Sequence, residues 1–135
     1  IWDGRSAMAA IDFSIPVLVV DDYRAILRIM QSLLRQLGFK HVDQAESGEE
    51  ALAKMRARPY GLVISDLHMA PVDGMELLQT AKADAALKDA RFLMITADLA
   101  PERVREAKDA GASGYMMKPF DAPTLRARIE GALAP

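Results

Sequence analysis

Five short apolar runs alternate with segments in which apolar residues recur at helical spacing, and this alternation dominates the 135-residue sequence. The runs with strand character are Val17–Val20, His41–Ala45, Gly61–Asp66, Arg91–Thr96 and Tyr115–Met117. The helical segments are Tyr23–Leu37, the stretch from Ser47 to Pro59, Met75–Ala83, Pro101–Ala110 and a last helix from about Ala122. Strands that alternate with helices imply parallel pairing, right-handed crossovers and helices on both faces of one sheet. The sequence therefore predicts an α/β fold built on a three-layer, doubly wound, five-stranded parallel sheet.

Residues at the ends of the helical segments support these boundaries. Gly38 is a typical C-terminal cap for the first helix. Ser47 with Glu50 three residues later has the pattern of a capping box, and Pro101 suits the first position of a helix. The stripe predicted to face the core in the first helix comprises Ile26, Met30, Leu33 and Leu37, widened by Leu27 and Leu34.

Length and composition narrow the function classes. We expect one domain over residues 11–135, with residues 1–10 a tail or an expression remnant, since Met8 could be the native start. The net charge is −2 (17 basic against 19 acidic residues), which argues against nucleic acid as the main partner. There are no cysteines, so disulfides and thiolate metal sites are excluded. No apolar run is long enough for a membrane span and no secretory signal is visible, so we expect a cytoplasmic protein with no membrane partner.

Polar side chains follow the predicted strands at the points where they end. Asp21 and Asp22 come after the first strand, and Asp66 ends the third. Thr96 ends the fourth strand, and Lys118 follows the fifth. The carboxyl ends of parallel strands meet at one edge of the sheet, where open sheets of this kind bind ligands. We therefore expect these five side chains to gather at one rim.

Gathered carboxylates need a compensating charge. Two of them about 4 Å apart repel by roughly 4 kcal/mol at an effective dielectric near 20, so either one is protonated or a cation lies among them. Ligation by oxygen alone suits Mg²⁺. Lys118 and the Thr96 hydroxyl could contact a transferred phosphoryl group. A carboxylate in such surroundings can act as a nucleophile and become an aspartyl phosphate.

Each of these residues also has an ordinary structural interpretation. A lone Asp after a strand is usually a helix cap. Thr96 alone could be a plain strand end, Lys118 a solvated loop charge and Tyr115 a half-buried packing residue. The joint pattern of three acids, a threonine and a lysine in strand order favours the functional interpretation.

The motifs "VLVVDD", "LGF", "VISD", "VDGMELL", "MITA" and "GASGYMMKPF" make the chain resemble bacterial response-regulator receiver domains, and in particular those of chemotaxis. The resemblance covers about Ile15 to Leu133 and makes residues 11–135 a receiver domain. It implies a flavodoxin-like fold with the strand order 2-1-3-4-5.

The resemblance also implies roles for the acids. Asp66 would be the phosphoacceptor. Mg²⁺ would be held by the carboxylates of Asp21, Asp22 and Asp66 and by the backbone carbonyl of His68.

Further roles implied by the resemblance belong to the last two strands. Thr96 would be the switch hydroxyl that reaches the phosphoryl group, and Lys118 would pair with that group. Lys118–Pro119 would be a cis peptide, and Tyr115 would turn inward when Thr96 moves.

Two features depart from the usual family pattern. Receivers commonly have Met-Pro after the acceptor loop, whereas Ala70 and Pro71 follow Met69 here, so we expect a reshaped loop. His68 is less usual at its position, two residues after the acceptor, where the family places a side chain near the hydrolytic water. Asp98, two residues after Thr96, would flank the route of that water. We predict that His68 and Asp98 tune the lifetime of the phosphate.

The resemblance implies a signalling protein and not an enzyme in the usual sense, with self-catalysed phosphotransfer and autodephosphorylation. A histidine kinase would be the phosphodonor, and a flagellar motor switch component or another protein would bind the surface of the fourth helix, fifth strand and fifth helix. The fourth helix, "PERVREAKDA", offers only Val104 and some alanines for burial, so we expect it to shift easily.

Four alternatives remain at this point. The chain could be a receiver fragment of a longer regulator or a non-phosphorylated interaction module on the same fold. A phosphatase of the haloacid dehalogenase kind needs a second Asp where His68 stands. A nucleotide-binding domain needs a glycine-rich motif after the first strand, which "DDYRAIL" lacks.

Overall fold

The computed structural model describes residues 11–69, 72–97 and 101–134, in which five strands alternate with five helices. The elements are β1 (Val17–Val20), α2 (Arg24–Leu37), β2 (Val42–Ala45), α3 (Gly48–Ala57), β3 (Leu62–Asp66), α4 (Gly74–Ala83), β4 (Arg91–Thr96), α5 (Pro101–Asp109), β5 (Gly114–Met117) and α6 (Ala122–Leu133). All neighbouring strands are parallel, in the order β2-β1-β3-β4-β5. The predicted fold class and strand order are confirmed.

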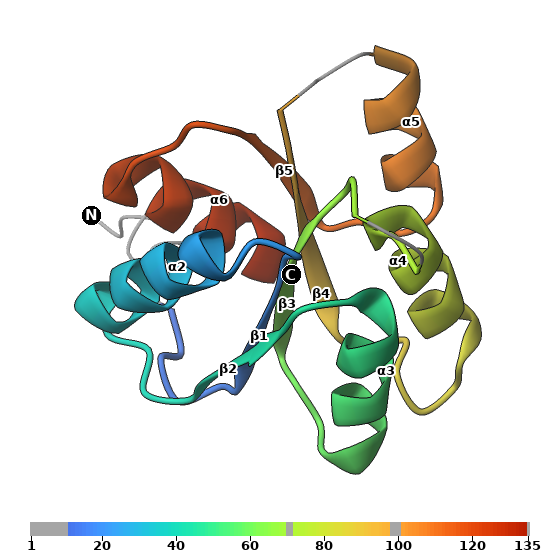
Figure 1. Ribbon diagram of the computed structural model, residues 1–135, viewed down its shortest axis with the longest axis horizontal. Helices are drawn as coiled ribbons and strands as arrows, with labels where there is room; N and C mark the ends of the chain where they lie inside the picture. Colours follow the sequence, from blue (N-terminus) through green and yellow to red (C-terminus); the bar gives the residue numbers. More distant parts are fainter. Residues whose placement is uncertain (1–10, 70–71, 98–100, 135) are drawn as a thin grey trace, which may run out of the picture.

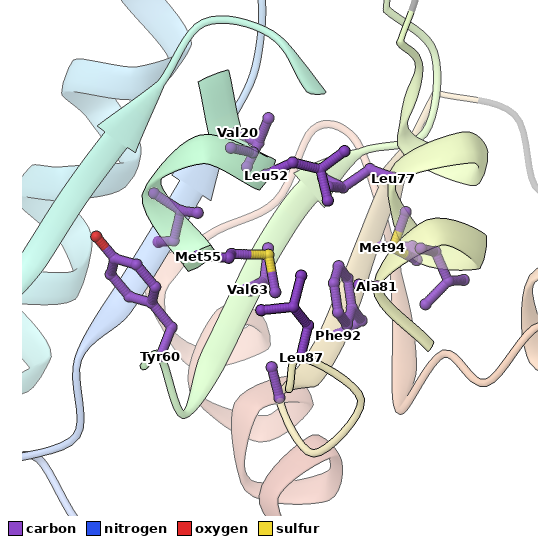
Figure 2. Close-up of a cluster of buried hydrophobic side chains, with 14 of the residues drawn as sticks. Val20, Leu52, Met55, Tyr60, Val63, Leu77, Ala81, Leu87, Phe92 and Met94 are labelled. Atoms are coloured by element: carbon purple, nitrogen blue, oxygen red, sulfur yellow. The ribbon is translucent and has the colours of Figure 1, made fainter. Parts of the chain in front are cut away.

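The sheet separates two layers of helices. Figure 1 shows α2 and α6 on one face, with α3, α4 and α5 on the other. Because successive side chains of a strand point to opposite faces, Leu18 and Val20 of β1 enter one core and Val17 and Val19 enter the other. All four are buried, as expected for a strand covered on both faces. Figure 2 shows the core under α3 and α4, where Leu77, Phe92 and Met94 are enclosed.

The first helix has the predicted amphipathic character, but its buried stripe has a different centre. The fully buried residues of α2 are Leu27, Met30 and Leu34. The others predicted to face the core are partly exposed: Ile26, Leu33 and Leu37. The periodicity gives the face of a helix, whereas the packing of α2 against the sheet decides which row lies deepest. The helix ends as predicted at Gly38, whose N–H donates to the carbonyls of Leu34 and Arg35.

The starts of α3 and α4 differ in how they are capped. Ser47 accepts from the Glu50 N–H at 3.1 Å, but the Glu50 carboxylate lies 3.5 Å from the Glu46 N–H and 3.4 Å from Lys54 instead of closing the predicted capping box. A complete box stands at α4, where Asp73 accepts from the Glu76 N–H and the Glu76 carboxylate accepts from the Asp73 N–H. The sequence "DGME" has the spacing for it.

Within the described ranges, every helix is too short or too polar to span a bilayer.

Candidate functional site

The parallel strands deliver the predicted polar residues to one edge of the sheet. Asp21 directly follows β1, Asp66 is the last residue of β3 and Thr96 is the last residue of β4. Lys118 follows β5, and its N–H donates to the Thr96 carbonyl at 2.9 Å. The registers pair Asp66 with Ile95 and Thr96 with Met117, so these strand ends are level with one another.

Three carboxylates form the centre of the site. Asp21, Asp22 and Asp66 each offer an oxygen, and these oxygens all lie within 4.8 Å of one another. Asp21 and Asp66 are only 3% and 6% exposed, whereas Asp22 is exposed. The cluster is therefore a cup with a buried floor of two acids and an open side at Asp22.

Lys118 bridges the two buried acids. Its Nζ lies 3.2 Å from Oδ2 of Asp21 and 3.3 Å from Oδ2 of Asp66. Burial lowers the pKa of Lys118, but the charges of Asp66 and Asp21 and the hydrogen bonds to both outweigh it, so the pKa is raised overall. The ammonium group is therefore held in its charged form beside the phosphoacceptor candidate.

Backbone donors fix the other oxygen of each buried acid. The Tyr23 N–H donates to Oδ1 of Asp21 at 2.9 Å, and the His68 N–H donates to Oδ1 of Asp66 at 3.2 Å. In both cases the donor is two residues after the acid, a local arrangement that aspartate commonly adopts. Burial raises the pKa of Asp21, and the Tyr23 N–H and Lys118 only partly oppose this. The backbone donors thus orient both carboxylates, and burial makes ionisation of Asp21 unfavourable.

The balance of charge favours a cation. With all groups ionised, the three carboxylates and the Lys118 ammonium sum to −2. A divalent cation would neutralise that charge, and a donor set of carboxylate oxygens suits a hard ion such as Mg²⁺. The residues present therefore fit a divalent-cation site, in which the carbonyl of His68 remains a predicted further ligand.

The predicted switch residues lie on the two neighbouring strands β4 and β5. Thr96 is 3% exposed at the end of β4, the strand that neighbours β3. Tyr115 on β5 is partly buried against the core of α3 and α4, and burial, with a contribution from Asp109, raises the pKa of its phenol. The Lys118–Pro119 peptide bond is cis, in agreement with the prediction.

Some predicted residues lie outside the described part of the chain, one has an exposed side chain, and one residue beside the site was not predicted. Asp98 and the departure at Ala70 and Pro71 lie outside the described residues. The side chain of His68 is exposed. Sequence reasoning missed Gly74, where an added Cβ would lie 2.1 Å from the Asp66 carbonyl oxygen. The available signal is the "VDG" motif, which by its composition predicts only a loop.

Comparisons with known proteins all indicate one family. The response regulator receiver domain family matches residues 17–130. The chain is 37% identical over 122 residues to chemotaxis protein CheY-3 of Vibrio cholerae, covering 90% of this chain and 94% of that protein. It is 37% identical over 114 residues to chemotaxis protein CheY of Pseudomonas aeruginosa, covering 84% and 92%. The crystal structure of Vibrio cholerae CheY4 superposes with a TM-score of 0.84 at 32% identity, covering 89% of this chain and 99% of that one.

Proposed function

The chain belongs to the response regulator receiver domain family, and we propose that it accepts a phosphoryl group on Asp66 from a histidine kinase. The observation that carries the proposal is the Asp66 carboxylate itself, buried beside Lys118 at 3.3 Å and grouped with two further acids within 4.8 Å. A carboxylate held in this way is a nucleophile with a cation beside the place where phosphoryl charge would develop.

In the proposed reaction, one carboxylate oxygen of Asp66 attacks the phosphorus of a phosphohistidine. The new P–O bond forms as the P–N bond breaks, and the histidine nitrogen leaves with the electron pair and takes a proton. Lys118 neutralises charge on the phosphoryl oxygens. Asp21, Asp22 and Asp66 with the His68 carbonyl would hold Mg²⁺, which when bound supplies positive charge to the same oxygens.

The phosphoryl group becomes a signal by competing for the donors of the site. In the unmodified protein Lys118 forms ion pairs with Asp21 and Asp66. The oxygens of a phosphoryl group on Asp66 would attract the Lys118 ammonium and the Thr96 hydroxyl. Tyr115 would then turn inward. A shift from 1:99 to 99:1 between two conformations needs about 5.5 kcal/mol of differential binding, which several charge-assisted hydrogen bonds can supply in part.

The proposed readout is the surface of α5, β5 and α6, which corresponds to the predicted fourth helix, fifth strand and fifth helix. The named relatives are chemotaxis proteins, which supports a chemotaxis pathway for this chain. For such a pathway we propose a location in the cytoplasm and a flagellar motor switch component as the downstream partner. Met117 at the end of β5 is 44% exposed and offers an apolar contact there.

The deciding experiment is incubation with Mg²⁺ and acetyl phosphate followed by intact-mass analysis. We expect a single phosphoryl adduct on the wild type and none on Asp66→Asn. Asp89→Asn, an exposed acid in the loop between α4 and β4, is the matched control and should be modified like the wild type. No adduct on the wild type would favour a non-phosphorylated interaction module, and steady phosphate release from varied monoesters would favour a phosphatase.

The lifetime of the phosphate is the second part of the proposal. We propose that His68 and Asp98 tune this lifetime through the hydrolytic water, although Asp98 lies outside the described residues. The imidazole of His68 is exposed, so its substitution should disturb the packing of the core little. We expect His68→Asn to change the autodephosphorylation rate, measured by loss of the adduct after the donor is removed. An unchanged rate would contradict this role.

A further inference from the structure

Ser65 is a fully buried polar residue directly before the phosphoacceptor candidate Asp66. All five residues of β3 are buried, and Ser65 itself is 0% exposed. Because side chains alternate along a strand, Ser65 lies on the same face as Val63, which belongs to the core shown in Figure 2. A hydroxyl on such a face lowers the stability of the fold unless it has a hydrogen-bond partner.

The partner of this hydroxyl is the main chain of Asp66. The Ser65 Oγ donates to the Asp66 carbonyl oxygen at a distance of 2.9 Å. The Leu67 N–H, which belongs to the same peptide group, donates to the Ile95 carbonyl of β4 at 2.8 Å. In a trans peptide group the C=O and the N–H point in opposite directions, so these two bonds hold the Asp66–Leu67 peptide group from both sides.

The carbonyl side of this peptide group lies past the end of a strand pair. The pairing of β1 with β3 ends with Val20 and Ser65, one residue before Asp66. The start of α4 also approaches closely here, since an added Cβ on Gly74 would lie 2.1 Å from the Asp66 carbonyl oxygen. The Ser65 hydroxyl therefore supplies a donor to a carbonyl that has little room to move.

The orientation of the same peptide group decides which donor meets the Asp66 carboxylate. The His68 N–H donates to Oδ1 of Asp66 at 3.2 Å, and Lys118 lies 3.3 Å from Oδ2. The peptide group before Leu67 and the one after it are rigid planes joined at the Leu67 Cα. A rotation of the first plane would carry the His68 N–H away from Oδ1, and the carboxylate could then turn relative to Lys118.

We propose that Ser65 is a positioning residue for the phosphoacceptor. Its hydroxyl fixes the Asp66–Leu67 peptide group, and that group in turn keeps the His68 N–H on the Asp66 carboxylate. The inference rests on the proposed phosphorylation of Asp66. Ser65 is fully buried, so it acts through the main chain of Asp66 and does not itself contact the phosphodonor.

The test is Ser65→Ala, which keeps a small side chain in the core and removes only the hydroxyl. We expect the rate constant of adduct formation with acetyl phosphate, at saturating Mg²⁺, to fall about tenfold, as is typical when a residue that supports metal ligands is changed. Ser65→Thr keeps a hydroxyl, so it should be phosphorylated faster than Ser65→Ala even if its extra methyl group lowers stability. A role in packing alone predicts the opposite order.

A second measurement needs no phosphoryl transfer. The amide proton of His68 is followed by NMR in the unmodified protein without Mg²⁺. In Ser65→Ala it should exchange faster and shift upfield, because its hydrogen bond to the Asp66 carboxylate is weakened, and Ser65→Thr should restore both values. Val63→Ala is the matched control, since Val63 is a fully buried residue on the same face of β3. It should lower stability and change neither the rate constant nor the His68 amide.

The outcomes separate this inference from the proposed function. Where the wild type is phosphorylated, an unchanged rate constant or an unchanged His68 amide in Ser65→Ala overturns the positioning role. Equal changes in Val63→Ala would also overturn it. Should Ser65→Ala fail to fold, Ser65→Cys replaces it with the same expectations, because a thiol is only a weak donor. A wild type that takes no phosphoryl group overturns the proposed function before any variant is compared.

Discussion

At the level of single residues, burial of the ionised Asp21 carboxylate lowers the stability of the fold. Asp21 is 3% exposed, and burial raises its pKa above the ordinary value of 3.8. The folded state therefore binds a proton at Asp21 more tightly than the unfolded state does. As pH rises from 3.8 through the raised pKa, the contribution of Asp21 to the free energy of unfolding must fall, because the unfolded state gives up its proton first.

The fall in stability with rising pH that Asp21 causes predicts the effect of Asp21→Asn. The substitution removes the ionised carboxylate. Relative to the wild type, it should raise the free energy of unfolding more at pH 7 than near pH 4, measured by urea unfolding without divalent cations. Asp121 is the control with the opposite sign, since its side-chain and backbone hydrogen bonds to Thr124 lower its pKa. Asp121→Asn should cost most at neutral pH and less in acid. A difference between Asp21→Asn and the wild type that is independent of pH would contradict the electrostatic account.

Among the elements, α5 is the least anchored helix. Of its nine residues only Ala107 is buried, and Val104 is partly exposed, as the sparse apolar pattern predicted. By contrast, α4 buries five residues: Gly74, Met75, Leu77, Leu78 and Ala81. A helix with so little buried surface can shift at a low free-energy cost, which suits an element next to the proposed switch.

Amide hydrogen exchange should show this difference. We expect the amides of α5 to exchange much faster than those of α4 in the unmodified protein, because local opening of α5 exposes little apolar surface. Phosphorylation should change the exchange of α5 while leaving α4 nearly constant, as followed by mass spectrometry of peptides. Strong protection throughout α5, with and without phosphate, would refute the idea of an easily shifted helix.

For the whole molecule, the central feature is one sheet shared by two cores. Leu34 of α2 belongs to the core on one face and Leu77 of α4 to the core on the other, and both are fully buried. Since the same strands send alternate side chains into each core, loss of either core removes support from the sheet. We therefore expect the domain to unfold as a single unit.

Leu34→Ala and Leu77→Ala test this coupling. Each should lower the free energy of unfolding by about 2–5 kcal/mol, the usual cost of a cavity at a buried leucine. The double variant should lose about the sum, because the two sites lie on opposite faces of the sheet. Urea unfolding followed by circular dichroism measures all three, and two separate transitions in either single variant would contradict the expected cooperativity.

Local patterns predict most of the elements. The strands Val17–Val20 and Arg91–Thr96 and the start of α5 at Pro101 stand at their predicted residues. These features depend on side chains and caps within a few residues of one another, so the sequence contains the information directly. The deepest row of α2 was not predicted, because it depends on packing against the sheet. The complete capping box at Asp73 was also missed, because its proline- and glycine-containing surroundings predict a loop.

The sequence by itself determined that acids, a threonine and a lysine end the strands of a parallel α/β sheet. The strand order came only from resemblance, because the same periodicity repeats in every strand and helix unit and does not say which strands are neighbours. The tertiary structure decided that Lys118 bridges Asp21, 97 positions away, and Asp66. It also decided that Gly48 meets Val72. Such contacts exist only when the packing of the whole sheet brings distant segments together, and no local pattern encodes their distances.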